Sequence, residues 1–167
     1  MGVFSSKIKQ ILILGLDGSG KTTIINRFKY GVSPETIPTI GYNNEIIKYK
    51  KYKFDMWDVG GNSNLRILWK YYIANIKGII YVIDSNDKDR LFLSRDCLED
   101  FLYINKLNNI PILMLANKQD YETATNMKKL NDIFTDYFIN EKIVLKSCCA
   151  IKGVGLYEGL KWLSKNI

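Results

Sequence analysis

The residues from Gly15 to Thr22 carry the clearest chemistry in the chain. They read GLDGSGKT, which fits the phosphate-loop pattern G-x-x-x-x-G-K-[ST] at every specified position. Glycines allow successive backbone N–H groups to point at phosphate oxygens. Lys21 can reach the outer phosphates of a nucleotide, and the Thr22 hydroxyl is placed to ligate a magnesium ion that bridges them. The alternative is a glycine-rich turn beside an unrelated lysine.

The flanking residues supply the elements that such a loop needs. Residues 11–14 are all isoleucine or leucine, which predicts a buried strand, and residues 22–28 predict a helix. Strand, loop and helix N-terminus therefore come in the required order, and the helix N-terminus adds partial positive charge near the phosphates. This context favours a phosphate loop over an accidental match.

A second candidate element ends a predicted hairpin. Residues 43–50 and 52–58 predict two strands joined by a short turn, and the second strand ends at Asp58. An acid at the carboxyl end of a strand can hold magnesium, directly or through water. The N–H of Gly61 can reach a terminal phosphate. The alternative is a strand that ends in an ordinary turn.

The rest of the chain alternates between helices and strands. Residues 31–41 contain two prolines and predict a mobile loop. Further strands are predicted at 79–83, 110–116 and 142–146. A short irregular helix is predicted at 63–75, and further helices are predicted at 88–105, 126–138 and 156–164. This alternation predicts an α/β fold with a mainly parallel sheet covered on both faces, and ligands bind beyond the carboxyl ends of such strands. The 167 residues suit a single domain with a short N-terminal extension at 1–7.

Composition narrows the class of protein. No apolar run approaches the roughly 18 residues of a membrane span, and no secretory signal is evident, so we expect a cytoplasmic protein that is peripheral on intracellular membranes. Histidine is absent, which excludes a histidine general base and a histidine-containing zinc site. Cys97, Cys148 and Cys149 have neither disulfide nor metal-ligand spacing and are expected to be reduced thiols.

The net charge of +7 favours an anionic partner. The lysines are scattered and no stacking motif accompanies them, so anionic lipid is favoured over nucleic acid, although a coding bias would give a similar composition. Residues 1–6 fit the myristoylation pattern M-G-x-x-x-[ST] with Gly2 as the acceptor. One acyl chain anchors a protein only marginally, so attachment through Gly2 stays a hypothesis.

From Gly15 to about Trp162 the chain resembles the small GTPases, and among them the Arf and Arf-like branch. The matching motifs are the phosphate loop, PTIG at 38–41, WDVGG at 57–61, NKQD at 117–120, CA at 149–150 and GLYEGL at 155–160. The resemblance implies a small G domain whose six-stranded, mostly parallel sheet has one antiparallel strand. It also implies a protein that binds GTP, GDP and Mg²⁺ and hydrolyses GTP. Nothing in the sequence suggests more than a monomer.

The resemblance assigns guanine selection to the NKQD element. Asp120 would accept hydrogen bonds from a donor pair that adenine lacks. Lys118 would lie along the base, Asn117 would tie this element to the phosphate loop, and the Ala150 N–H would meet the guanine oxygen. The implied nucleotide-binding residues are Asp17, Gly18, Ser19, Gly20, Lys21, Thr22, Thr23, Thr39, Gly61, Asn117, Lys118, Asp120, Cys149 and Ala150, and the implied magnesium ligands are Thr22, Thr39 and Asp58. The Asp17 side chain itself receives no role, because it could repel an added charge, contact an exchange factor or face solvent.

Thr39 and Gly61 match the two switch contacts of the family, which form only when GTP is bound. Loss of the γ-phosphate would release both loops, and the hairpin at roughly 43–57 would shift its register. Three aromatic residues match the effector-binding surface of the family, with a core role as the alternative. They are Tyr42, Trp57 and Tyr72.

Two departures from the family pattern change the expected activity. Asn62 stands where the family has a glutamine that orients the attacking water, so we expect slow intrinsic hydrolysis. The implied catalytic residues are Asn62, Lys21, Thr39 and Gly61. The second departure is the short N-terminus, which leaves no room for the family's long amphipathic helix.

The resemblance implies a switch that an exchange factor and a GTPase-activating protein control and that recruits effectors in vesicle traffic, with the Golgi or another endomembrane as its location. An alternative is a GTP-loaded scaffold that scarcely hydrolyses GTP. A phosphotransferase is a third possibility, which the lack of an arginine cluster disfavours.

Overall fold

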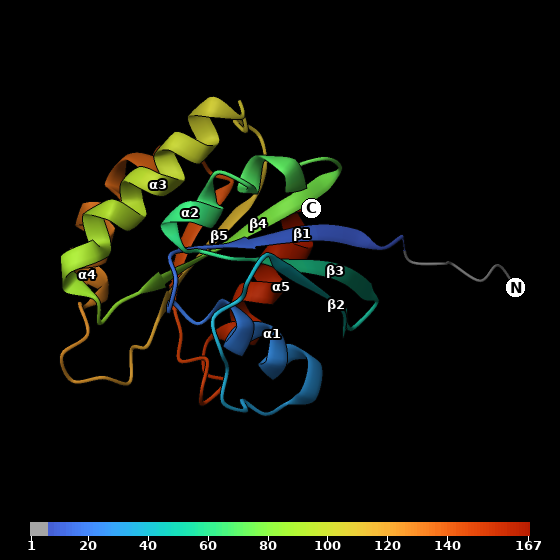
Figure 1. Cartoon of the computed structure of the whole chain (residues 1–167), viewed down its shortest axis with the longest axis horizontal. Helices are drawn as coiled ribbons and strands as arrows, with labels where there is room; N and C mark the ends of the chain where they lie inside the picture. The colour runs from blue at the N-terminus through green and yellow to red at the C-terminus, as the bar shows by residue number, and fades with distance from the viewer. Residues whose placement is uncertain (1–6) are drawn as a thin grey trace, which may run out of the picture.

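Six strands form one sheet in the order β2-β3-β1-β4-β5-β6 (Figure 1). The computed structural model describes residues 7–167. β2 and β3 pair antiparallel, and the other neighbouring strands pair parallel. This confirms the predicted α/β fold with a mostly parallel sheet. The strands are β1 (Lys9–Leu14), β2 (Tyr42–Tyr49), β3 (Tyr52–Val59), β4 (Ile76–Asp84), β5 (Ile112–Asn117) and β6 (Ile143–Ser147).

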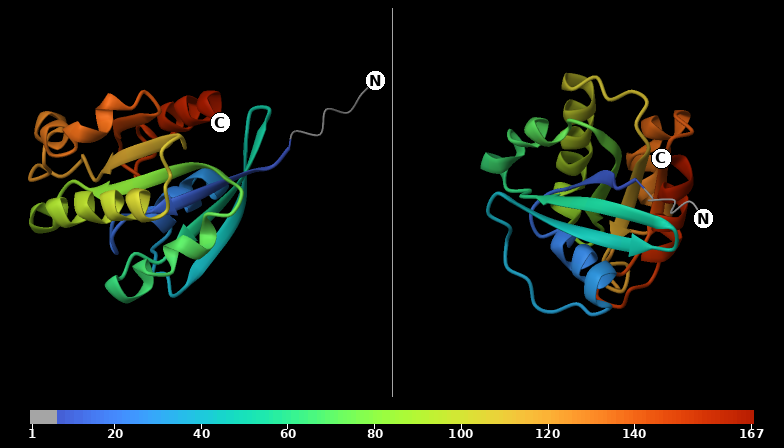
Figure 2. Two further views of the ribbon diagram at one scale, coloured as in Figure 1. Left: turned by 90° about the horizontal axis from the view of Figure 1, so that it is seen from above. Right: turned by 90° about the vertical axis from the view of Figure 1, so that its right-hand side faces the viewer.

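Helices cover both faces of the sheet (Figure 2). One apolar core lies between the sheet and α1 and α5, and a second lies between the sheet and α3 and α4. The α-helices are α1 (Lys21–Tyr30), α2 (Ser63–Arg66), α3 (Leu91–Ile104), α4 (Met127–Ile133) and α5 (Leu156–Asn166), and the 3₁₀ turns are η1 (Trp69–Tyr72), η2 (Lys88–Arg90) and η3 (Thr135–Ile139).

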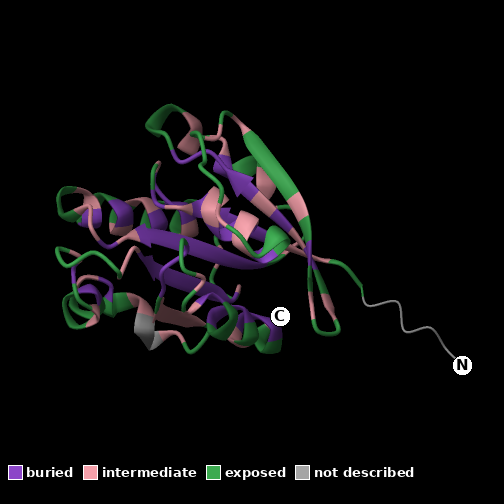
Figure 3. Ribbon diagram, turned by 90° about the horizontal axis from the view of Figure 1, so that it is seen from below, coloured by how far each residue is buried: buried purple, intermediate pink, exposed green. Residues whose placement is uncertain are grey.

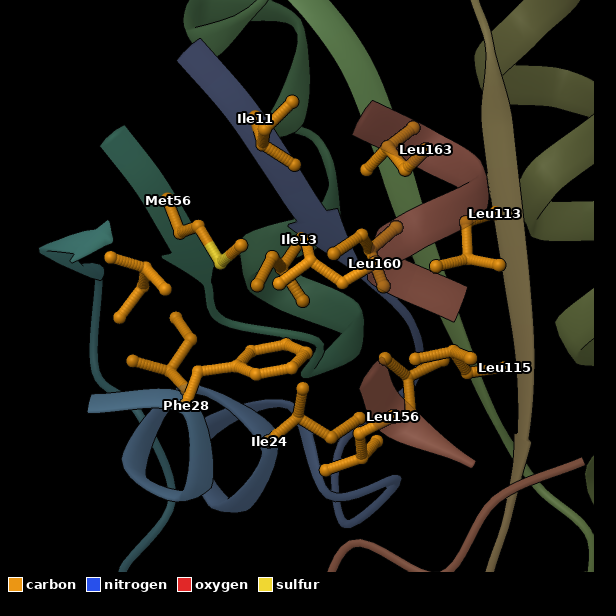
Figure 4. Close-up of a cluster of buried hydrophobic side chains, with 14 of the residues drawn as sticks. Ile11, Ile13, Ile24, Phe28, Met56, Leu113, Leu115, Leu156, Leu160 and Leu163 are labelled. Carbon is orange, nitrogen blue, oxygen red and sulfur yellow. The ribbon is translucent and has the colours of Figure 1, made fainter. Parts of the chain in front are cut away.

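The isoleucine and leucine residues of β1 supply both cores. Successive side chains of a strand point to opposite faces, so a continuous apolar run is buried on both sides. Ile11 and Ile13 pack with α1 and α5 (Figure 4), whereas Leu12 and Leu14 belong to the cluster on the α3 side. All four are fully buried, and the central strands form the buried interior seen in Figure 3. The strand that leads into the phosphate loop is thus held rigidly.

Three predicted helices are interrupted in the structure. The predicted irregular helix at 63–75 divides into α2 and η1, because Trp69 turns into the core and its indole N–H donates to the Gly60 carbonyl at 3.0 Å. The prediction for 88–105 begins as the 3₁₀ turn η2 and becomes α-helical only at Leu91. The prediction for 126–138 breaks at the fully buried Phe134, where α4 gives way to η3.

Three segments lie together at the end of the sheet opposite the phosphate loop. They are the start of β1, the turn between β2 and β3, and the end of α5. Lys9 lies beside Phe54 of β3, and its ammonium donates to the Ile167 carbonyl at 2.6 Å. The predicted acylation site, Gly2, lies outside the described residues. Within residues 7–167, no helix has the length and apolar character needed to cross a bilayer.

Candidate nucleotide-binding site

The loop between β1 and α1 has the backbone geometry of a phosphate cradle. Gly18 and Gly20 have φ angles of 74° and 100°, in the left-handed region that favours glycine. A Cβ on Gly20 would lie 2.3 Å from the side-chain nitrogen of Asn117, so a larger residue cannot replace it without displacing that side chain. Backbone conformation therefore favours glycine at both positions, and close approach to Asn117 adds a second requirement at Gly20.

Lys21 is buried at the first turn of α1. Its ammonium donates to the carbonyl oxygens of Gly15 at 3.1 Å and Leu16 at 2.9 Å. Burial lowers the pKa of Lys21, and the charges of Asp58 and Asp17 act in the opposite direction. An ammonium has three N–H donors, so one remains for a phosphate oxygen after the two bonds within the loop.

The three residues predicted as magnesium ligands meet at one point, although they come from α1, the loop before β2, and β3. Thr22 donates its hydroxyl to Asp58 Oδ2, and Thr39 donates to the same oxygen at 3.3 Å. The two threonine oxygens are 3.0 Å apart. Asp58 is fully buried and its Oδ1 has no protein partner. Two hydroxyls and a carboxylate with a buried unpartnered oxygen are hard ligands that fit magnesium.

The environment of Asp58 is unfavourable for a charge that has no cation beside it. Burial raises the pKa of Asp58, while the hydrogen bond from Thr22 and the charge of Lys21 lower it. A divalent cation bound at these oxygens would favour the ionised carboxylate. The electrostatics therefore agree with the chemistry of the donor set.

The two loops that follow α1 and β3 contact one another and the phosphate loop. The Gly60 N–H donates to the Gly41 carbonyl at 2.9 Å. A Cβ on Gly61 would lie 2.2 Å from the Gly15 carbonyl oxygen, so this backbone packs directly on the phosphate loop. Arg66 donates from Nε to the Gly61 carbonyl at 3.1 Å, beside the bond from Trp69 to Gly60. Arg66 and Trp69 are support residues that the sequence analysis missed, since nothing in their local pattern separates them from packing residues.

Asn117 joins the loop after β5 to two others. Its side-chain nitrogen donates to the Ser19 carbonyl at 2.9 Å, and its side-chain oxygen accepts from the Ala150 N–H at 2.9 Å. The Ala150 N–H, which the resemblance assigns to the guanine oxygen, thus has a protein partner in this structure. The Asn117 side-chain carbonyl is buried and therefore needs a donor.

The other residues of this element differ in exposure. Lys118 has a left-handed φ of 66° and donates from Nζ to Asp84 at 2.6 Å. Asp120 is exposed, whereas Cys149 is buried. Burial raises the pKa of the Cys149 thiol, and the neighbouring Asp120 carboxylate adds to this effect. Cys149 is therefore a neutral, buried thiol beside Asp120.

Asn62 forms a helix cap in this structure. Its side-chain oxygen accepts from the Asn64 N–H at 3.0 Å and so closes the N-terminus of α2. Asparagine is a preferred residue at this position because its short amide reaches the free N–H groups of the first turn. The side chain that stands where the family has its water-orienting glutamine is therefore engaged with its own helix.

A cavity of about 510 Å³ lies beside the phosphate loop. It brings together residues of the phosphate loop, both switch loops and the loop after β5. Thr36, Ile37, Tyr121 and Ile151 were not predicted, and each lies in a loop next to a predicted motif. The cavity is lined by Asp17, Gly18, Gly20, Lys21, Thr22, Thr23, Thr36, Ile37, Pro38, Thr39, Gly61, Asn62, Lys118, Tyr121 and Ile151.

Tyr42, Trp57 and Tyr72 form one aromatic cluster beside this site. Tyr42 stacks on Trp57 with ring centroids 5.2 Å apart, and Tyr72 is 5.5 Å from Tyr42 and 5.9 Å from Trp57. Tyr42 is 52% exposed, which excludes a core role for it, while Trp57 and Tyr72 are half-buried against the core on the α3 side. The cluster is therefore a surface that the core supports.

Three features together define a small G domain. They are a phosphate loop next to a buried aspartate, two loops that meet over that aspartate, and an NKQD element at the same end of the sheet. The chain belongs to the ADP-ribosylation factor family, whose family model matches residues 2–167, and it is an Arf-family GTP-binding switch protein. Among solved structures it is similar to the Arl6 BBS3 small GTPase from Trypanosoma brucei with bound nucleotide analogue GppNp. The two are 32% identical over 95% of this chain and 96% of that chain, with a TM-score of 0.84.

Proposed function

We propose that this protein is a magnesium-dependent GTP/GDP switch that hydrolyses GTP slowly and recruits effectors at intracellular membranes. The observation that carries the proposal is the convergence of Thr22, Thr39 and Asp58 on one point beside Lys21. These three residues would hold magnesium, whose charge would offset that of the outer phosphates. Thr39 belongs to the loop that would respond to nucleotide, so its contact couples the γ-phosphate to the surface of the protein.

The role of Asn62 supports slow hydrolysis. Its amide is one methylene shorter than that of glutamine, and its oxygen caps α2. To orient a water molecule, the side chain would have to give up the cap, which is worth about 1 kcal/mol. We therefore propose that the protein remains in its GTP form until an activating protein rearranges this loop.

Two surfaces support the proposed partners. The aromatic cluster of Tyr42, Trp57 and Tyr72 joins both switch segments, so an effector bound there would sense both loops. Exposed lysines gather at the end of the sheet opposite the phosphate loop, which we call the lysine-rich edge. This surface favours an anionic lipid partner. Its lysines are Lys7, Lys48, Lys50, Lys51, Lys53, Lys77, Lys106, Lys142 and Lys165. This arrangement leaves the nucleotide site free while the lysine-rich edge faces a membrane, in vesicle traffic at the Golgi or a related compartment.

The experiment that tests the switch is single-turnover hydrolysis of bound GTP in excess magnesium, without added partners, for the wild type and Asn62→Gln. We expect Asn62→Gln to be at least several-fold faster, because glutamine reaches further and caps a helix less well. Equal and fast rates would show that another group positions the water, and they would contradict slow hydrolysis.

A GTP-loaded scaffold is the second candidate, and the Asn62 cap favours it too. It predicts tight GTP binding with no turnover in either protein, even after the asparagine is replaced. The same assay therefore separates the two functions. A wild type that binds neither GTP nor GDP in magnesium would contradict both.

A further inference from the structure

Arg90 links the start of α3 to the phosphate loop. Its Nη1 donates to the Asp17 carboxylate at 2.9 Å and its Nη2 donates to the Asp17 carbonyl at 3.2 Å. Its Nε donates to the Asp87 carboxylate at 2.6 Å. One guanidinium thus binds both the backbone and the side chain of a loop residue 73 positions away, and it is itself held by a third bond.

The Asp17 carboxylate carries a negative charge beside the proposed phosphate site. Asp17 borders the nucleotide cavity together with Lys21 and Gly61. Its charge is felt at the Lys21 ammonium, where it opposes the fall in pKa that burial causes. The Gly61 backbone, which the switch proposal assigns to the terminal phosphate, packs against Asp17, because a Cβ on Gly61 would lie 2.6 Å from the Asp17 nitrogen. An unneutralised Asp17 would therefore repel the phosphates, and the most highly charged nucleotide would suffer most.

We propose that Arg90 is a positioning residue of the nucleotide site, which neutralises Asp17 and holds its carboxylate away from the terminal phosphate. The inference rests on the proposed function, because the phosphates are those of GTP and GDP. Its consequence is a specific one: Arg90 supports the binding of a third phosphate more than the binding of two. Because the Arg90 and Asp17 side chains are 35% and 48% exposed, solvent weakens the interaction and the effect is modest.

The test compares dissociation constants for GDP and the analogue GppNp in excess magnesium. In Arg90→Gln we expect GppNp binding to weaken about 3- to 10-fold more than GDP binding, the range of a partly exposed ion pair within a network. In the double variant Arg90→Gln with Asp17→Asn, the ratio of the two constants should return to within about twofold of the wild-type value, because the repelling charge is gone. Higher ionic strength should shrink the effect of Arg90→Gln.

Arg95→Gln is the matched control. Arg95 lies in the first half of α3, five residues after Arg90, and pairs with Asp96 at 2.7 Å, so its replacement removes the same charge from a nearby position without touching the phosphate loop. We expect its ratio of constants to equal that of the wild type. Asp17→Asn alone offers a second route if Arg90→Gln folds poorly: it should leave the ratio unchanged or shift it towards GppNp.

Four results would overturn the inference. They are an unchanged ratio in Arg90→Gln, an equal change in Arg95→Gln, a double variant that is not restored, and a shift towards GDP in Asp17→Asn alone. In each of these the wild type still binds both nucleotides, so the proposed function stands and only the role of Arg90 fails. A wild type that binds neither nucleotide overturns the function and the inference together.

Discussion

The hydroxyl oxygens of Thr22 and Thr39 lie 3.0 Å apart, although the first belongs to α1 and the second to the loop before β2. Both hydroxyls donate to Asp58 Oδ2. The bond from the Gly60 N–H to the Gly41 carbonyl continues this contact to the second switch loop. Hydrogen bonds within the protein therefore hold the loop before β2 and the loop after β3 together. This is the arrangement that the switch proposal requires of the GTP form.

Asp58→Asn should change how stability depends on pH in the protein without magnesium and nucleotide. Burial raises the pKa of Asp58 above its value in the unfolded chain, so the folded state binds a proton more readily. Stability from this group is then fully present below the unfolded pKa and is lost as pH rises through the raised pKa. Asparagine cannot ionise, so urea unfolding at a series of pH values should show a flatter profile for the variant. At pH 7 it should be more stable than the wild type by roughly 1 to 3 kcal/mol.

Magnesium and GDP should reverse this order, because a bound cation favours the ionised carboxylate. In their presence Asp58→Asn should be the less stable protein and should bind nucleotide more weakly. Stability must be measured both with and without magnesium and GDP. If Asp58 had only a structural role, the difference in stability between Asp58→Asn and the wild type would have the same sign in both conditions. Without ligand, parallel profiles of stability against pH for the wild type and Asp58→Asn would show that burial does not raise the pKa of Asp58.

Asn117→Ala should destabilise the fold and speed nucleotide release. The substitution leaves the Ala150 N–H and the Ser19 carbonyl, each bonded at 2.9 Å in the wild type, without that partner in a buried place. An orphaned buried polar group costs about 1 to 3 kcal/mol. We expect a loss of roughly 2 to 4 kcal/mol in the free energy of unfolding by urea.

Asn131→Ala, on the exposed face of α4, is the matched control and should change stability by less than about 0.5 kcal/mol. The nucleotide dissociation rate should rise only in Asn117→Ala, since Asn117 bridges loops of the site and Asn131 does not contact them. Equal losses of stability in both variants would show that Asn117 does not act through its buried bonds.

Trp69→Phe isolates the bond that holds the second switch loop. Phenylalanine keeps an aromatic ring beside Phe101, whose ring centroid is 5.7 Å from that of Trp69, but it removes the indole donor to the Gly60 carbonyl. We expect a loss of about 1 to 3 kcal/mol by urea unfolding, from the unsatisfied carbonyl and the smaller ring. Trp162→Phe, in a half-buried place on α5, gives the cost of the smaller ring alone. If the two variants lose the same stability, the bond to Gly60 contributes nothing measurable.

Much of the fold and many of the site loops could be predicted because the signals are local. The isoleucine and leucine run of β1 and the glycine-rich loop after it need only their neighbours to be interpreted. The contact of Arg90 with the phosphate loop could not be predicted in this way. Arg90 meets Asp17 only because β1 and β4 are adjacent in the sheet, and a single sequence does not encode that distance directly. The interrupted helix at 63–75 has the same origin, since the partner of Trp69 is the Gly60 carbonyl and not a residue at helical spacing.

The lysine-rich edge makes a prediction that is independent of acylation. Lys50 and Lys51 form the turn between β2 and β3, where both are exposed, and an anionic surface attracts each lysine near it by about 1 kcal/mol. Non-acylated protein should therefore bind vesicles that contain phosphatidylserine and not vesicles of phosphatidylcholine alone. The double variant Lys50→Gln with Lys51→Gln should bind about 10- to 30-fold more weakly in a flotation assay.

Lys128→Gln with Lys129→Gln is the matched control for this measurement. It removes the same charge from exposed positions on α4, away from the lysine-rich edge, and should bind vesicles like the wild type. Added salt should weaken binding of the wild type, because the attraction is screened within a Debye length. Equal weakening in both double variants would mean that net charge alone drives binding, and the lysine-rich edge would then have no orienting role. Loss in the turn variant alone would orient the molecule with its nucleotide site and aromatic cluster away from the bilayer, where an effector can reach them.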